Sequence, residues 1–157
     1  MSWPADSPPS FLSFLSPDDP DLRFPGTSHA LANPPGLLAI GGDLRPERLL
    51  QAYRSGIFPW YETPGPILWW SPDPRFVWLR DGLRRPKRLT RTIRQEQGRF
   101  TFTIDQDFKN ILMQCGPERR ESSGTWITAE MAQAYLDLYH LGYAHSVEMN
   151  DKSNTCA

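Results

Sequence analysis

Aromatic side chains outside helices are the first group in this sequence that could perform chemistry. Four of the six tryptophans follow or lie among prolines and glycines, namely Trp60, Trp69, Trp70 and Trp126. Aromatic faces on loops are suited to stacking the unpaired bases of a nucleic-acid end. Because large aromatic residues also dominate protein cores, a buried structural role is the alternative for each tryptophan taken singly.

A basic segment after Pro86 could hold phosphate groups. Its cationic residues, together with one just before it, are Arg84, Lys87, Arg88, Arg91 and Arg94. Spacings of four and three residues place Lys87, Arg91 and Arg94 on one face of a predicted helix. That face would project a positive potential although the formal net charge is only -1. A solvated charged surface is the alternative.

The histidines, cysteines and serine that could form a metal site or a nucleophilic site are not spaced as such a site requires. The three histidines are His29, His140 and His145. None of them has a second ligand at metal-binding spacing, and the two cysteines lie in no CxxC pattern. His145 precedes Ser146, but neighbours in a strand point to opposite faces, so the two cannot form a local acid-base pair. We predict no metal site.

Length and composition fit a soluble globular protein. The 157 residues are 39% apolar and 22% charged, which suits one ordinary domain or two small ones. No apolar run approaches the roughly 18 to 20 residues needed to cross a bilayer, and no positive charge precedes Arg23. We therefore predict no membrane association and no secretory signal, and expect a cytoplasmic protein.

The spacing of apolar and turn residues predicts a mixed α and β structure. A proline-rich, irregular lead-in precedes residue 36, and Gly41 and Gly42 predict a tight turn. Helices are predicted over 46–55, 86–96, 108–115 and 129–141, the last with Thr128 as its N-cap. Strands are predicted over 67–70, 76–79, 99–104 and 145–149. For the last strand we expect an open edge without a partner in this chain.

Several motifs follow one another in an order that resembles a known family. They are IGGDL at residues 40–44, GIFPW at 56–60, WWSPDPR at 69–75, GTWIT at 124–128 and HLGYAHSVE at 140–148. From about Phe24 to Glu148 the chain resembles the front part of the leucyl/phenylalanyl-tRNA-protein transferases. The resemblance is long and collinear, and the GIFPW and WWSPDPR strings are unusual.

The resemblance implies an α+β fold with two domains. A small N-terminal α+β domain would cover residues 24–72, after an irregular extension over 1–23. Residues 73–157 would form the first part of an acetyltransferase-like (GNAT-type) mixed sheet with helices. This second domain would be incomplete.

The resemblance also implies an activity and its site. Members of the family move leucine or phenylalanine from aminoacyl-tRNA to the N-terminal arginine or lysine of an acceptor protein, which marks it for degradation. They need no metal and no organic cofactor. By matched position, Trp60 and Trp126 would line the site for the 3′-terminal aminoacyl-adenosine. Residues of the basic segment match a region that meets the tRNA acceptor end, namely Lys87, Arg88, Arg91 and Arg94.

The sequence departs from the family pattern after Met149. The GESMF-like string and the later Asp and Gln that assist the acceptor amine have no counterpart, so no catalytic residue is carried over. The resemblance therefore implies a C-terminally truncated chain with little or no transfer activity of its own. The alternatives are a noncatalytic module that binds the tRNA acceptor end and an unstable remnant with an incomplete core.

Overall fold

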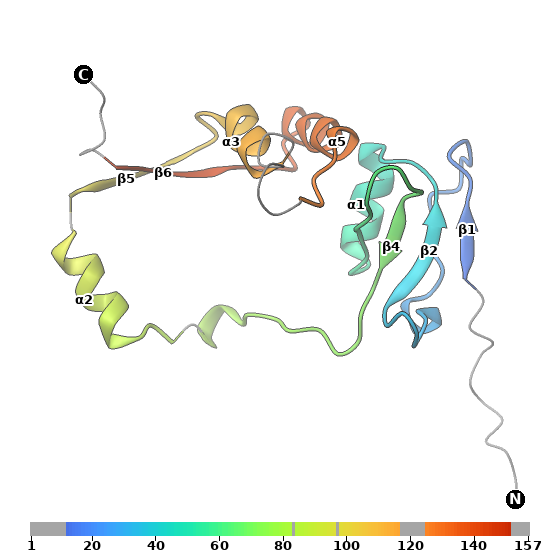
Figure 1. Ribbon diagram of the computed structural model, residues 1–157, viewed down its shortest axis with the longest axis horizontal. Helices are drawn as coiled ribbons and strands as arrows, with labels where there is room; N and C mark the ends of the chain where they lie inside the picture. Colours follow the sequence, from blue (N-terminus) through green and yellow to red (C-terminus); the bar gives the residue numbers. More distant parts are fainter. Residues whose placement is uncertain (1–11, 83, 97, 117–124, 152–157) are drawn as a thin grey trace, which may run out of the picture.

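A four-stranded sheet forms one side of the protein in the computed structural model, which describes residues 12–82, 84–96, 98–116 and 125–151 (Figure 1). Its strands in spatial order are β1 (Ser13–Leu15), β2 (Leu37–Gly41), β4 (Leu68–Trp70) and β3 (Phe58–Pro59). β1 is parallel to β2, and the other pairs are antiparallel. The strand predicted over 67–70 is confirmed as β4. β1 lies where irregular structure was predicted, because a three-residue strand carries almost no periodic signal.

Two glycines turn the chain from β2 into α1 (Pro46–Arg54), as predicted. Gly41 has φ +89° and Gly42 has φ +77°, in the left-handed region that favours glycine. A Cβ atom on Gly41 would lie 2.6 Å from the carbonyl oxygen of Leu15. The close approach of β1 therefore also requires glycine here.

A buried arginine ties α1 to the segment after β1. Arg48 is fully buried, and its Nε donates to the Asp43 carboxylate at 3.0 Å. Its Nη2 donates to the backbone carbonyl of Ser16 at 3.3 Å. Because a buried charge is tolerated only when it is paired and hydrogen-bonded, this pair holds the start of α1 and the chain after β1 in one arrangement.

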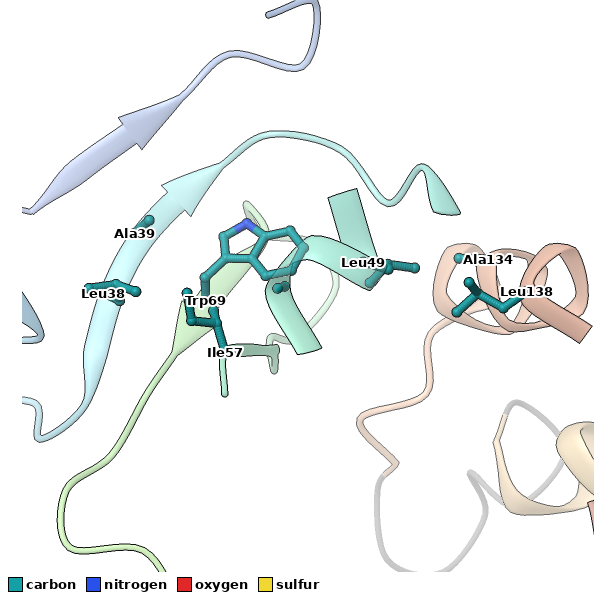
Figure 2. Packing of buried hydrophobic residues seen from close by; sticks show 8 residues of the cluster. Leu38, Ala39, Leu49, Ile57, Trp69, Ala134 and Leu138 are labelled. Carbon is teal, nitrogen blue, oxygen red and sulfur yellow. The ribbon is translucent and has the colours of Figure 1, made fainter. Parts of the chain in front are cut away.

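The helix α5 (Ala129–His140) packs into the same core as the sheet (Figure 2). The buried cluster contains Leu38, Ala39, Leu49, Ala52, Ile57, Trp69, Ala134 and Leu138. The predicted N-cap is confirmed, since Thr128 Oγ1 accepts from the Met131 amide at 3.1 Å. Residues from before and after position 72 thus share one core, while the domain boundary proposed there stays a prediction.

A second cluster joins α5 to α3 (Phe108–Cys115), which matches its predicted bounds. Its buried members are Tyr61, Phe108, Leu112, Ile127, Met131 and Ala132. The rings of Phe108 and Tyr139 stack with centroids 4.2 Å apart. α3 is therefore held to the rest of the protein through α5.

The strand β5 (Phe100–Ile104) pairs with β6 (Val147–Asp151) in a regular antiparallel register of five residues. The prediction that the last strand has no partner in this chain is wrong. The helices α3 and α5 lie between the strands in sequence, so no local pattern could indicate the pairing. In Figure 1 the two strands extend away from α3 and α5.

The segment between β4 and β5 contains the basic helix α2 (Lys87–Gln95), as predicted. The same segment differs from the prediction at residues 76–79. These residues were expected to form a strand, but they are exposed and lie in no strand. The α+β class is confirmed, whereas an acetyltransferase-like arrangement stays a prediction. Among the described residues, no helix combines the length and apolar character that crossing a membrane requires.

Candidate functional site

An aromatic hollow lies between α1, β3, the loop before α5 and α5 itself. Its volume is about 360 Å³, within the range of small-molecule sites. The residues that line it are Tyr53, Phe58, Pro59, Trp60, Trp126 and Tyr135. The fold thus brings together two tryptophans that lie far apart in sequence, which are the two that the sequence analysis proposed for aminoacyl-adenosine.

The tryptophans of the aromatic motifs separate into buried and accessible residues. Trp69 is 0% exposed, and its indole Nε1 donates to the Gly41 carbonyl at 2.9 Å, so it belongs to the core. Trp60 is 55% exposed and Trp126 is 41% exposed. Trp70 supports Trp60 through a hydrogen bond from its Nε1 to the Trp60 carbonyl at 2.7 Å. The alternative of a purely buried role therefore holds for Trp69 but not for Trp60 or Trp126.

The ring of Trp126 is oriented by Tyr135 of α5. The two ring centroids are 6.3 Å apart, and the planes meet at 78°, an edge-to-face arrangement. This contact leaves part of the indole exposed to the hollow. A planar ligand could therefore add a second aromatic contact.

Two tyrosine hydroxyls meet beside the hollow. The oxygen atoms of Tyr53 and Tyr135 lie 2.6 Å apart, which joins α1 to α5. Burial raises the pKa of both phenols above the ordinary value of 10.0, so both stay protonated near neutral pH. Because one hydrogen bond uses only one of the two hydroxyl hydrogens, the other is available to an acceptor on a ligand.

Arg75 places a positive charge at the same edge of the protein. Its Nη1 donates to the Gly56 carbonyl at 3.0 Å, and its guanidinium lies 5.0 Å from the ring centroid of Phe58. Arg75, Tyr53 and Tyr135 were not among the predicted site residues. Arg75 lies in the WWSPDPR motif, and the two tyrosines lie in the predicted helices 46–55 and 129–141.

The cationic residues of α2 lie apart from the hollow. Lys87, Arg88, Arg91 and Arg94 are all exposed, and α2 has no buried residue. Figure 1 shows α2 well separated from α1 and α5. The described structure therefore presents a basic helix and an aromatic hollow as two surfaces, not as one site.

The polar residues around Ser146 have a structural arrangement. His145 Nδ1 lies 2.6 Å from Asp105 Oδ2, whereas Ser146 Oγ donates to Glu148 Oε1 at 2.5 Å. The hydroxyl of Ser146 is therefore not paired with His145, as predicted, but β6 begins at Val147 and not at His145, so alternation within a strand is not the reason. Within the described ranges, no group of three or more His, Cys, Asp or Glu side chains could hold a metal ion.

The contact between His145 and Asp105 predicts a pH-dependent stability. The hydrogen bond to Asp105 raises the pKa of His145 above 6.5, so the folded state holds this proton more tightly than the unfolded chain. The contact therefore stabilises the folded protein fully at pH values below the pKa that His145 has in the unfolded chain. This stabilisation is lost as the pH rises through the pKa that His145 has in the folded protein. We expect NMR titration to give His145 a pKa above 6.5, and a lower one in Asp105→Asn. The control is Glu47→Gln, in which the pKa of His145 should not change. The pairing would be contradicted if the pKa of His145 stayed the same in Asp105→Asn, or if it fell by the same amount in Glu47→Gln.

Comparisons with known protein families give the same relationship as the motifs. The sequence model described as "Leucyl/phenylalanyl-tRNA protein transferase" matches residues 77–156, so the expectation that the family pattern ends after Met149 is wrong. The model of the N-terminal domain of the same family matches residues 42–73. Together they include the basic helix and both tryptophans of the hollow.

Individual relatives carry the family name. The leucyl/phenylalanyl-tRNA--protein transferase of Saccharophagus degradans is 49% identical over 137 residues, which are 87% of this chain and 55% of the relative. The corresponding protein of Xanthomonas axonopodis pv. citri is 50% identical over 141 residues, 89% of this chain and 56% of the relative. That of Azotobacter vinelandii is 52% identical over 128 residues, 82% of this chain and 56% of the relative.

The match covers most of this chain but only part of each relative. The chain spans about half the length of the curated relatives that it matches. The family model nevertheless covers more than half of the chain, and the N-terminal model covers a further segment. The chain belongs to the leucyl/phenylalanyl-tRNA protein transferase family.

Proposed function

We propose that this chain supplies the aminoacyl-adenosine-binding part of an aminoacyltransferase. The enzyme would move leucine or phenylalanine from aminoacyl-tRNA to the N-terminal arginine or lysine of an acceptor protein, in the N-degron pathway of the cytoplasm. The observation that carries the proposal is the aromatic hollow, in which Trp60 and Trp126 are accessible together. Family membership supplies the reaction.

The hollow offers the contacts that the end of a charged tRNA requires. Accessible indole rings can stack on the terminal adenine, and such stacking contributes about 1–3 kcal/mol per base. The free hydroxyl hydrogen of the Tyr53–Tyr135 pair can bind an acceptor oxygen of the ribose or the ester. Holding the aminoacyl ester in place beside the acceptor amine is the main catalytic need of this transfer.

We further propose that the 157 residues alone transfer little or no amino acid. Transfer also needs groups that hold the acceptor amine and stabilise the developing oxyanion, and the resemblance assigns these to parts of the family beyond the matched motifs. The test is transfer of labelled phenylalanine from charged tRNA to a protein that begins with arginine. We expect transfer by a chain extended with the C-terminal part of a relative. Transfer by the 157-residue chain at the same rate would contradict this proposal.

A noncatalytic module for the tRNA acceptor end is the second candidate. It is favoured by the exposed cationic face of α2, which could contact phosphates without any transfer chemistry. The extended chain distinguishes the two candidates, because a purely binding protein would still fail to transfer phenylalanine after the extension.

The cations of α2 predict a salt-dependent contact with tRNA. In the double variant Lys87→Gln/Arg91→Gln we expect weaker binding of tRNA. A plot of the logarithm of the binding constant against the logarithm of the salt concentration should also have a slope that is shallower by roughly 0.7–0.9 for each lost phosphate contact. Both side chains are exposed, so the fold should be retained. The control is Lys109→Gln on α3, which removes one positive charge where the double variant removes two. A loss of binding free energy in this control of half that of the double variant, or more, would assign the effect to overall charge instead of α2.

The shared core predicts how the chain behaves toward proteases, which tests the remnant alternative. Because Ala134 and Leu138 pack with Leu49 and Trp69, a product that ends near residue 72 would lose part of its own core. We expect limited proteolysis to leave a resistant species that retains α5, identified by mass spectrometry. Accumulation of a stable fragment that ends near residue 72 would show that the first domain folds alone.

A further inference from the structure

Arg75 is fixed against the segment that forms one wall of the aromatic hollow. Its Nη1 donates to the Gly56 carbonyl at 3.0 Å, and its guanidinium carbon lies 5.0 Å from the ring centroid of Phe58, a cation–π distance. Phe58 itself lines the hollow, and so does Trp60, two residues further along the same segment. Two contacts with the GIFPW motif therefore hold the charge of Arg75 at the wall of the hollow.

These contacts leave most of the guanidinium unused. Arginine carries five N–H donors, and the Gly56 carbonyl accepts from only one nitrogen. Arg75 is exposed, and the ion pairs found among the described residues do not include it. A positive charge that is already held in place loses little conformational entropy when it binds an anion from outside the chain.

The geometry of the free N–H groups favours a phosphate as that anion. The guanidinium is planar, and its donors match two oxygens of a phosphate at once, whereas an ammonium acts as a point charge. In an RNA strand the phosphodiester is attached to the 5′ carbon of each nucleoside. An adenosine at the 3′ end of a strand, bound in the hollow, therefore brings one phosphodiester to the edge of the hollow.

The basic helix α2 does not supply a cation at that edge. Figure 1 shows α2 well separated from α1 and α5, which carry Tyr53 and Tyr135 of the hollow. Phosphates held by α2 therefore belong to nucleotides further from the terminal adenosine. Arg75, by contrast, contacts a lining residue of the hollow directly.

We propose that Arg75 binds the phosphodiester that joins the terminal adenosine to the nucleotide before it, as an anion subsite separate from the cations of α2. The inference rests on the proposed function, because it requires an adenosine in the hollow. The contact distinguishes the end of an RNA strand from a free aminoacyl-nucleoside, which has no such phosphate. It also fixes the direction in which the strand leaves the hollow, since phosphate contacts set the register of a bound strand.

The test measures the binding of two dinucleotide analogues to the 157-residue chain by titration calorimetry. Both are cytidylyl-adenosines with phenylalanine joined to the 3′ position through a stable amide. One has the natural phosphodiester, and the other has an uncharged methylphosphonate in its place. We expect the parent chain to bind the phosphodiester analogue about tenfold more tightly, because its hydrogen bond to Arg75 is charge-assisted.

Variants then assign this preference to one side chain. In Arg75→Gln the two analogues should bind with affinities that agree within about twofold, since the partner of the phosphate charge is gone. Arg75→Lys keeps the charge without the planar fork and should keep part of the preference. The control Lys109→Gln removes an exposed charge on α3 and should keep all of it.

Two results in Arg75→Gln would overturn the inference. One is a preference for the phosphodiester as large as in the parent chain. The other is an equal loss of affinity for both analogues, which would mean that Arg75 only supports Phe58 and the turn at Gly56.

A phosphate-free ligand separates this inference from the proposed function. The ligand is adenosine with the same 3′ phenylalanyl amide and a free 5′ hydroxyl. If it binds the parent chain but the dinucleotides show no preference for the charged linkage, the phosphate subsite is wrong and the adenosine site stands. If neither it nor the dinucleotides bind, both are wrong.

Discussion

Replacement of Trp69 by alanine is expected to lower the free energy of unfolding by about 3–5 kcal/mol. Trp69 is 0% exposed in the core shared by the sheet, α1 and α5. Its ring meets Phe24 edge-on at a centroid distance of 4.8 Å, and its Nε1 donates to the Gly41 carbonyl. Alanine would leave a large cavity and remove that hydrogen bond. Urea denaturation followed by circular dichroism measures the effect.

Two further variants separate the contributions to this loss. Trp69→Phe keeps most of the apolar volume but leaves the Gly41 carbonyl without its donor, at a cost of about 1–3 kcal/mol. Trp78→Ala removes an exposed indole and should change stability by less than about 0.5 kcal/mol. Equal effects of Trp69→Ala and Trp78→Ala would contradict the central position of Trp69 in the core.

Because a domain of this size is stable by only about 5–15 kcal/mol, Trp69→Ala should also loosen the hollow. Gly41, whose carbonyl receives the indole hydrogen bond, begins the turn into α1, and α1 carries Tyr53 of the hollow. The buried tryptophan and the accessible ones are thus linked through one turn. Stability and binding must therefore be measured on the same variants.

The helices could be predicted from the sequence because their signals are local. α1, α2, α3 and α5 begin and end within about two residues of the predicted bounds, where prolines, Thr128 and Gly142 interrupt regular apolar spacing. Their packing partners could not be predicted. The contribution of Ala134 and Leu138 to the core of the sheet depends on contacts across more than 60 residues of sequence, and no local pattern reports such contacts.

The strands were less predictable for two physical reasons. β1 and β3 are too short to show alternation, and the pairing of β5 with β6 joins segments on either side of α3 and α5. Residues 76–79 have strand-like composition but form no strand in the described structure. Strand propensity expresses the fit to a half-buried surface, and no such surface covers these residues here.

The candidate site was predictable in part. The resemblance pointed to Trp60 and Trp126, and the structure places both in one hollow, although their binding role stays a prediction. Tyr53 and Tyr135 lie in predicted helices and were not predicted as site residues. Their hydroxyl contact arises from the packing of α1 against α5, so only the structure could reveal it.

Replacement of Trp126 by alanine is expected to lower kcat/KM for phenylalanyl-tRNA by about 5–150-fold in the chain extended with the C-terminal part of a relative. This range corresponds to the ~1–3 kcal/mol of one base stacked on an aromatic ring. The indole is 41% exposed and is held edge-on by Tyr135, so its removal takes away a wall of the hollow and little core volume. Transfer kinetics under single-turnover conditions measure the loss, and circular dichroism checks the fold.

The variants Trp126→Phe and Trp60→Ala decide whether stacking is the cause. Trp126→Phe keeps an aromatic face and should retain part of the activity, whereas Trp78→Ala, which removes an indole outside the hollow, should retain all of it. If Trp60 and Trp126 contact the same bound adenosine, the losses in Trp60→Ala and Trp126→Ala should not add in the double variant, because residues that share a partner are coupled. Additive losses would indicate that the two rings act on separate parts of the substrate, and unchanged kinetics in Trp126→Ala with an intact fold would remove Trp126 from the site.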